Sequence, residues 1–130
     1  EDYMIVRPAR QDDIPAIVEI VERCGLASEG IDYSQWSGVV IVAVRQAQVI
    51  GFISALPAKP YAVILEMGVL PEHQKSRAAV KLWEGMELLL RSMGVRSWAA
   101  FIGEKRDVNE TMPKLGAVCT GMGKMWMRSL

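Results

Sequence analysis

The sequence predicts an α+β fold with one mixed, mostly antiparallel sheet of about seven strands and helices on both faces. Three consecutive apolar runs, at residues 39–45, 49–56 and 61–69, are separated only by short turns, which favours antiparallel pairing. A helix-spaced segment at 76–93 separates the third run from another at 95–102, and such a strand–helix–strand unit favours one parallel crossover. Together these patterns indicate an α+β arrangement rather than a doubly wound one.

The amino-terminal part predicts a strand at residues 3–8 and a helix at residues 11–24. Asp12 or Asp13 can cap this helix, because a short carboxylate side chain accepts a hydrogen bond from the first backbone N–H groups. Gly25 follows the last apolar position and is a typical stop.

The other connections carry weaker patterns. A short helix is predicted at residues 33–37, and Gly51 marks a bulge in the second central strand. Beyond the long helix, a polar helix is expected at 104–115, followed by a closing hairpin with strands at 117–120 and 124–128.

The segment at 76–93 has the clearest helical pattern in the chain. Glu87 and Arg91 form an i,i+4 pair that we expect on its solvent side, and Ser76 is its expected cap. Its apolar positions recur every three or four residues: Ala79, Leu82, Trp83, Met86, Leu89, Leu90 and Met93.

Composition limits the classes of function. The 130 residues fit one domain spanning residues 1–130, and 51% of them are apolar. Fifteen basic and fifteen acidic side chains cancel, which argues against broad binding of nucleic acid or anionic membrane. The apolar runs are too short to cross a bilayer. We therefore expect neither nucleic acid nor a membrane as a partner.

Two cysteines, Cys24 and Cys119, and one histidine, His73, do not have the spacing of a metal site. We expect no metal. The sequence shows no charged-then-apolar export signal, so free thiols in a cytoplasmic protein are the expected state.

A polar loop joins the strand at 61–69 to the long helix. The N-terminus of a helix presents unpaired N–H groups and the positive end of its dipole, which together attract anions. Lys75 and Arg77 add positive charge at the same place. The sequence therefore predicts a loop that holds a diphosphate.

Three short segments, in this order along the chain, carry a family resemblance. They are Ile5-Val6-Arg7-Pro8-Ala9, Leu65-Glu66-Met67-Gly68-Val69-Leu70-Pro71-Glu72-His73 and Lys114-Leu115-Gly116-Ala117. Together with the order of the elements, they resemble the GNAT superfamily of N-acetyltransferases over almost the whole chain. The resemblance implies that the diphosphate belongs to acetyl-CoA, the cosubstrate, and that the acceptor is a primary amine.

The acyl-CoA signature of that family, Gln/Arg-x-x-Gly-x-Gly/Ala, falls on residues 74–79. Gln74 and Ala79 match it, but Arg77 stands where the family has glycine. Arg77 either offers its guanidinium to the phosphates or blocks the groove. The resemblance implies these cofactor-binding residues: Gly68, Val69, Leu70, Gln74, Lys75, Ser76, Arg77, Ala78 and Ala79.

By the same resemblance, the acceptor amine attacks the thioester directly and a backbone N–H near Val69 polarises the thioester carbonyl. Glu66 is the candidate catalytic base, because it interrupts an apolar strand where members of the family carry a catalytic carboxylate. The alternative is a structural carboxylate. The family's usual acid, a tyrosine, falls on Met112, so water or another residue supplies the proton, or activity is absent.

Tyr33 and Trp36 lie in the segment that shapes the acceptor pocket in the family, although they can equally pack a short helix. Two alternatives to the enzyme stay open: a catalytically inactive acyl-CoA-binding or regulatory module, and an assembly protein. The assembly-protein hypothesis rests on the methionine- and tryptophan-rich hairpin around Met125 and Trp126. The same hairpin could form the contact of a homodimer. The sequence does not identify the amine, and its compact length favours an exposed one, such as a protein lysine or terminus.

Overall fold

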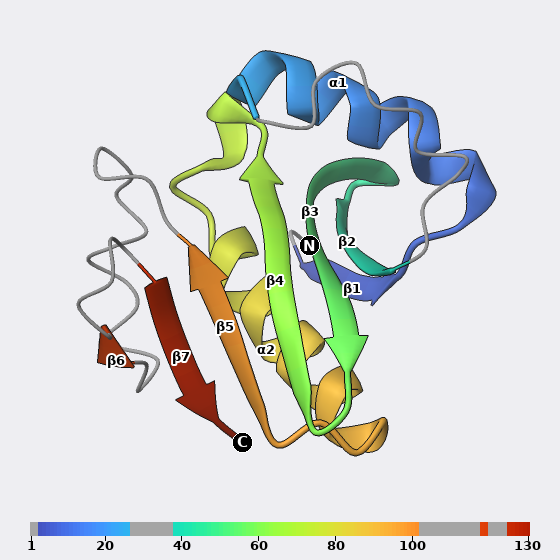
Figure 1. Cartoon of the computed structure of the whole chain (residues 1–130). Helices are drawn as coiled ribbons and strands as arrows, with labels where there is room; N and C mark the ends of the chain where they lie inside the picture. The colour runs from blue at the N-terminus through green and yellow to red at the C-terminus, as the bar shows by residue number, and fades with distance from the viewer. Residues whose placement is uncertain (1–2, 27–37, 102–117, 120–124) are drawn as a thin grey trace.

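The computed structural model describes residues 3–26, 38–101, 118–119 and 125–130. In these residues the strands form one seven-stranded sheet in the order β1-β2-β3-β4-β5-β7-β6 (Figure 1). The elements are β1 (Met4–Pro8), the 3-10 turn η1 (Gln11–Asp13), α1 (Ile14–Cys24), β2 (Val39–Arg45), β3 (Gln48–Ala58), β4 (Tyr61–Val69), the 3-10 turn η3 (Pro71–His73), α2 (Ala78–Ser92), β5 (Ser97–Phe101), β6 (Val118–Cys119) and β7 (Met125–Ser129).

The strand pairing confirms the predicted fold class. Strands β1 to β4 form consecutive antiparallel pairs, because each is joined to the next by a connection that reverses the chain. The pair β4–β5 is parallel, with α2 as the crossover, and β5–β7–β6 is again antiparallel. The sheet is therefore mixed and mostly antiparallel.

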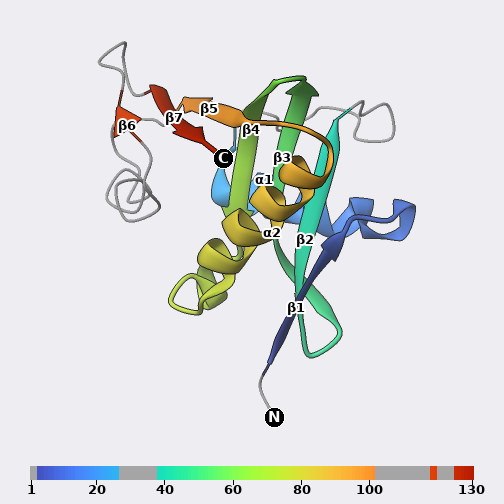
Figure 2. The same cartoon turned by 90° about the horizontal axis from the view of Figure 1, so that it is seen from below.

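The two helices cover opposite faces of the sheet (Figures 1 and 2). Each helix buries one apolar stripe, and each face therefore has its own core. The core under α1 includes Ile17, Ile20, Val21, Val42, Phe52 and Leu70. The larger core under α2 includes Ile41, Ile53, Ile64, Leu82, Trp83, Met86, Leu90 and Trp98.

Several predicted boundaries shift: the first helix, for example, starts as the 3-10 turn Gln11–Asp13 and becomes α-helical at Ile14. Two of the shifts have a clear reason in the backbone. The helix α2 begins at Ala78 rather than at residue 76, because its N-cap, Arg77, has non-helical dihedral angles (φ −88°, ψ 19°). Ser76 still helps this end, since its Oγ accepts the N–H of Ala78 at 3.2 Å. The strand β5 begins two residues later than predicted, because Arg96 donates its N–H to the Pro60 carbonyl at 2.7 Å instead.

Bulges set which side chains face each helix. The register between β2 and β3 shifts beside Gly51, as predicted. A second shift, between β3 and β4, leaves Leu65 without a paired residue, so the alternation of β4 changes phase there. Ile64 and Val69 both pack on the α2 side as a result, and Glu66 lies on the α1 side.

The expectation for Glu87 was wrong. Glu87 is only 6% exposed and does not lie on the solvent side. It accepts a hydrogen bond from Trp98 Nε1 at 2.7 Å and pairs with Arg128 Nη1 at 2.9 Å. The reason is that β5 and β7 pass over this part of α2, which no local pattern reveals.

The helices predicted at 33–37 and 104–115 lie outside the described residues, as do Tyr33, Trp36 and Met112. The hairpin strands predicted near the carboxyl end are observed as β6 and β7. In the part of the chain that the structure describes, no helix is long and apolar enough to span a membrane.

Candidate functional site

The central feature is an opening between β4 and β5. These strands pair only where Tyr61–Ile64 runs beside Ser97–Ala100. The strand β4 continues to Val69, past the end of β5 (Figure 1). Among the described residues, no strand pairs with this edge of β4 from residue 65 to residue 69. Backbone groups at such an edge can receive an extended ligand as an added strand.

The main chain at the end of β4 is fixed in orientation. Leu70 donates its N–H to the Ile50 carbonyl at 2.8 Å. Because successive strand residues direct their backbone groups to opposite sides, the N–H of Val69 points to the open edge. The Val69 carbonyl accepts from Gln74 Nε2 at 3.1 Å and from Cys24 Sγ at 3.3 Å. The predicted cofactor residue Gln74 thus contacts β4 itself.

Gly68 allows α1 to lie directly on β4. A Cβ at this position would come within 2.9 Å of Ile20 Cγ2 and 3.0 Å of Leu26 Cδ1, closer than real side chains pack. The absence of a side chain at Gly68 therefore sets how closely α1 approaches the strand that carries the open edge.

The loop between β4 and α2 is folded into successive turns. His73 donates its N–H to Leu70, and Ser76 donates both its N–H and its Oγ–H to the His73 carbonyl, at 3.1 and 2.5 Å. No described residue accepts the N–H groups of Ala79 and Val80 in the first turn of α2. The predicted anion site therefore has unpaired donors.

Positive charge gathers at these donors, and no carboxylate in the described ranges neutralises it. Lys75 and Arg77 are both exposed, and no described carboxylate forms an ion pair with either. The backbone of Arg77, with φ −88°, lies in a region that any residue adopts. Arg77 thus adopts this conformation without strain, and its side chain is exposed to solvent.

Two arginines from other elements tie down the turn η3. Arg23 of α1 donates to both carboxylate oxygens of Glu72, at 2.7 and 3.1 Å, and this hydrogen bonding lowers the pKa of Glu72. Arg45 of β2 lies 3.3 Å from Nδ1 of His73, which must be the acceptor because a guanidinium only donates. The loop is held from both sides.

Glu66 is half-buried on β4, next to the opening. It pairs across the sheet with Ser54, whose Oγ donates to the Glu66 carbonyl at 3.4 Å. Ser54 is fully buried and was not predicted as a site residue. Its only signal in the sequence is that it interrupts an apolar strand, as Glu66 does.

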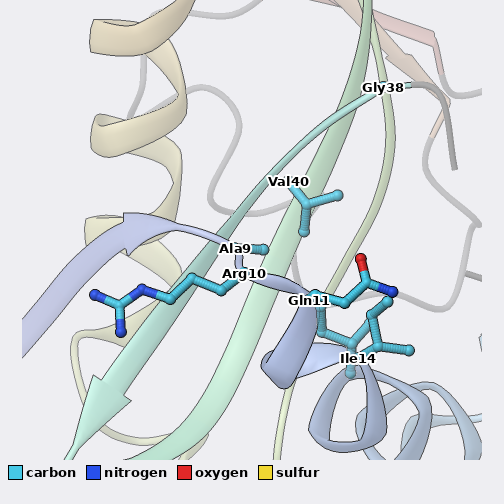
Figure 3. Close-up of a pocket in the computed structure, with 7 residues that line it drawn as sticks. Ala9, Arg10, Gln11, Ile14, Gly38 and Val40 are labelled. Atoms are coloured by element: carbon cyan, nitrogen blue, oxygen red, sulfur yellow. The ribbon is translucent and has the colours of Figure 1, made fainter. Parts of the chain in front are cut away.

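A pocket of about 180 Å³ lies on the same face of the sheet (Figure 3). Apolar side chains of Ile14 and Val40 line it together with Gln11, and Arg10 extends away from it (Figure 3). Val40 pairs with Ser54, and Ser54 with Glu66. Two strand spacings therefore separate the pocket wall from Glu66, about 10 Å between Cα atoms.

The structure thus places Glu66, Gly68 and Val69 along the opening and residues 74–79 after its end. Leu70, also predicted to bind the cofactor, is instead buried in the core under α1 and donates its N–H to β3. Tyr33 and Trp36 lie outside the described residues. Within the described ranges, no group of three or more His, Cys, Asp or Glu side chains could hold a metal ion.

A model of the acetyltransferase (GNAT) family matches residues 9–111. No curated protein matches the sequence significantly.

Solved structures share the fold at low sequence identity. Ard1 from Thermoplasma volcanium is 18% identical, with a TM-score of 0.81 over 98% of this chain and 97% of its own. The ribosomal-protein-S18-alanine N-acetyltransferase from Escherichia coli is 16% identical, with a TM-score of 0.79 over 96% and 90%. A GNAT family acetyltransferase from Brucella melitensis, in complex with acetyl-CoA, is 18% identical, with a TM-score of 0.77 over 100% and 90%.

Proposed function

The chain belongs to the GNAT acetyltransferase family, and from this premise we propose that it transfers an acetyl group from acetyl-CoA to a primary amine. One continuous feature of the structure supports the proposal. An open edge of β4 leads to the N-terminus of α2, where donors and cationic side chains have no described partner.

The residues present fit acetyl-CoA. The N–H groups of Ala79 and Val80, with Lys75 and Arg77, suit a diphosphate because they combine the helix N-terminus with exposed positive charge. The open edge at Val69 suits the amide-bearing arm, since an extended chain adds there as a strand does. When bound, acetyl-CoA supplies a thioester whose acyl carbon accepts a nucleophile.

Two groups of this chain carry the chemistry. The N–H of Val69 donates to the thioester carbonyl and stabilises the negative charge that develops on its oxygen. Glu66 accepts a proton from the acceptor's ammonium group, so that the neutral amine attacks the acyl carbon directly. The C–N bond forms and the C–S bond breaks. The attacking nitrogen loses its second proton to water, and the leaving thiolate takes a proton from water.

We assign the acceptor to the α1 face of the sheet. Glu66 lies on that face, and so does the pocket near Val40. Tyr33 and Trp36 remain proposed acceptor-binding residues. The structurally similar enzyme from Escherichia coli is named for an alanine of a ribosomal protein. A terminus or a lysine exposed on a protein is therefore the acceptor we propose.

Replacing Glu66 tests the assignment. We expect Glu66→Gln to lower the rate of thiol release from acetyl-CoA, measured with a panel of peptide and small amines, by about 10²- to 10⁴-fold. Binding of acetyl-CoA should be unchanged, because the amide keeps the shape of the side chain. Glu84→Gln, an exposed glutamate on α2, is the control. Equal rates in wild type and Glu66→Gln at every pH would remove Glu66 as the base.

A further inference from the structure

Trp83 carries a buried donor that is not satisfied. Its side chain is 1% exposed, and its Nε1 has no hydrogen-bond partner among the described residues. Buried tryptophan N–H groups normally have an acceptor, because leaving one unpaired costs free energy. The neighbouring Trp98 follows this rule, since its Nε1 donates to Glu87. An unpaired N–H at Trp83 therefore requires an explanation.

Its position places the donor at the opening of the sheet. Trp83 lies one helical turn before Glu87 on α2, so both face the same way, about 6 Å apart. Glu87 accepts a hydrogen bond from Trp98 of β5. Trp98 lies two residues before Ala100, the last residue of β5 that pairs with β4. Trp83 is therefore level with the end of the β4–β5 pairing, where the open edge begins.

Two neighbouring positions carry small side chains. One turn further toward the helix N-terminus, on the same stripe, is Ala79, and the last paired residue of β5 is Ala100. Both carry only a methyl group. The indole rings of Trp83 and Trp98 pack at a centroid distance of 4.9 Å, which holds the Trp83 ring in place.

We propose that Trp83 Nε1 donates a hydrogen bond to a carbonyl oxygen of the acyl-pantetheine arm of the cosubstrate. This inference rests on the proposed function, which places that arm along the open edge of β4. An indole N–H can only donate, and the arm offers two amide carbonyls and one thioester carbonyl as acceptors. The bond satisfies the buried donor only when the cosubstrate is present.

The test observes the indole N–H directly by NMR of the full chain with ¹⁵N-labelled tryptophan. The Trp83→Phe variant identifies the Trp83 signal by its disappearance and keeps an aromatic ring at this position. We expect coenzyme A or acetyl-CoA to move this signal downfield and to slow its exchange with water. Adenosine 3′,5′-diphosphate, which lacks the arm, should leave it in place, and the signal of Trp98 serves as the internal control.

Affinity gives a second measurement. Losing one hydrogen bond should weaken the binding of coenzyme A to Trp83→Phe by about 3- to 10-fold, with adenosine 3′,5′-diphosphate binding unchanged. If coenzyme A binds but neither the Trp83 signal nor this affinity changes, the inference is overturned and the proposed function stands. If no coenzyme A binds at all, both are overturned.

Discussion

Asp13 shows how a single residue can keep its predicted position and take another role. The sequence marks it as a cap of the first helix, but its carboxylate makes no capping bond to α1. Instead it accepts the N–H of Arg10 at 2.7 Å and two bonds from the Arg7 guanidinium, at 2.7 and 3.1 Å. Asp13 therefore joins β1 to the turn that starts α1, and the hydrogen bond from Arg7 lowers its pKa.

This ion pair predicts a dependence of stability on pH. A carboxylate whose pKa is lower in the folded chain stabilises the fold above its ordinary value of 3.8, and this contribution disappears as the pH falls through the folded pKa. We expect Asp13→Asn to lower the free energy of unfolding by about 1–3 kcal/mol at neutral pH. Urea titrations at neutral and acidic pH should show less acid sensitivity in the variant. The exposed Asp12, changed to Asn, is the control, and equal acid sensitivity in wild type and Asp13→Asn would contradict the assignment.

At the scale of the elements, the helix α2 has the apolar face that its sequence predicts, and it also has a buried carboxylate, Glu87, that the sequence does not predict. The apolar spacing of this helix correctly identifies Leu82, Trp83, Met86 and Leu90 in the larger core, with Ala79 and Leu89 packed against it. Met93, also predicted, is not part of that core. Glu87 lies among the core side chains because Trp98 of β5 and Arg128 of β7 supply a donor and a positive charge. Burial of a carboxylate is tolerated only with such partners, and they come from distant segments of the chain. Glu87 therefore connects the helix to the carboxyl-terminal strands.

Removing this carboxylate should destabilise the chain strongly. We expect Glu87→Ala to lower the free energy of unfolding by about 3–5 kcal/mol, because Arg128 and the Trp98 N–H both lose their partner. Guanidinium unfolding followed by circular dichroism measures the change. Glu84→Ala, on the exposed side of the same helix, should change stability by less than about 0.5 kcal/mol. Similar losses in the two variants would show that Glu87 has no special role.

The whole molecule is a sheet opened at one end, with a separate core on each face. The α2 face continues into the loop that we propose binds the diphosphate, and the α1 face carries Glu66 and the pocket. In the proposed function, cosubstrate and acceptor have separate approaches that meet between β4 and β5.

Ligand binding should be visible in the stability of the whole fold. Acetyl-CoA at 100 times its dissociation constant should stabilise the native state by about 2.7 kcal/mol and raise Tm by several degrees. Arg77→Glu should abolish most of this shift at the same concentration, since it reverses the charge at the phosphate site. Arg91→Glu, at the other end of α2, is the matched control. Thermal unfolding followed by fluorescence measures both, and an undiminished shift in Arg77→Glu would show that Arg77 does not face the phosphates.

The order of the described elements, the fold class and the loop before α2 follow from the sequence alone. Apolar periodicity and the residues that begin and end helices are local properties, so they can be recognised without coordinates. The phase change at Leu65, the burial of Glu87 and the Trp83 N–H that has no acceptor among the described residues emerge only in the folded chain. Each of these depends on which distant segments pack together, and that choice is made by the whole core rather than by any short stretch of chain.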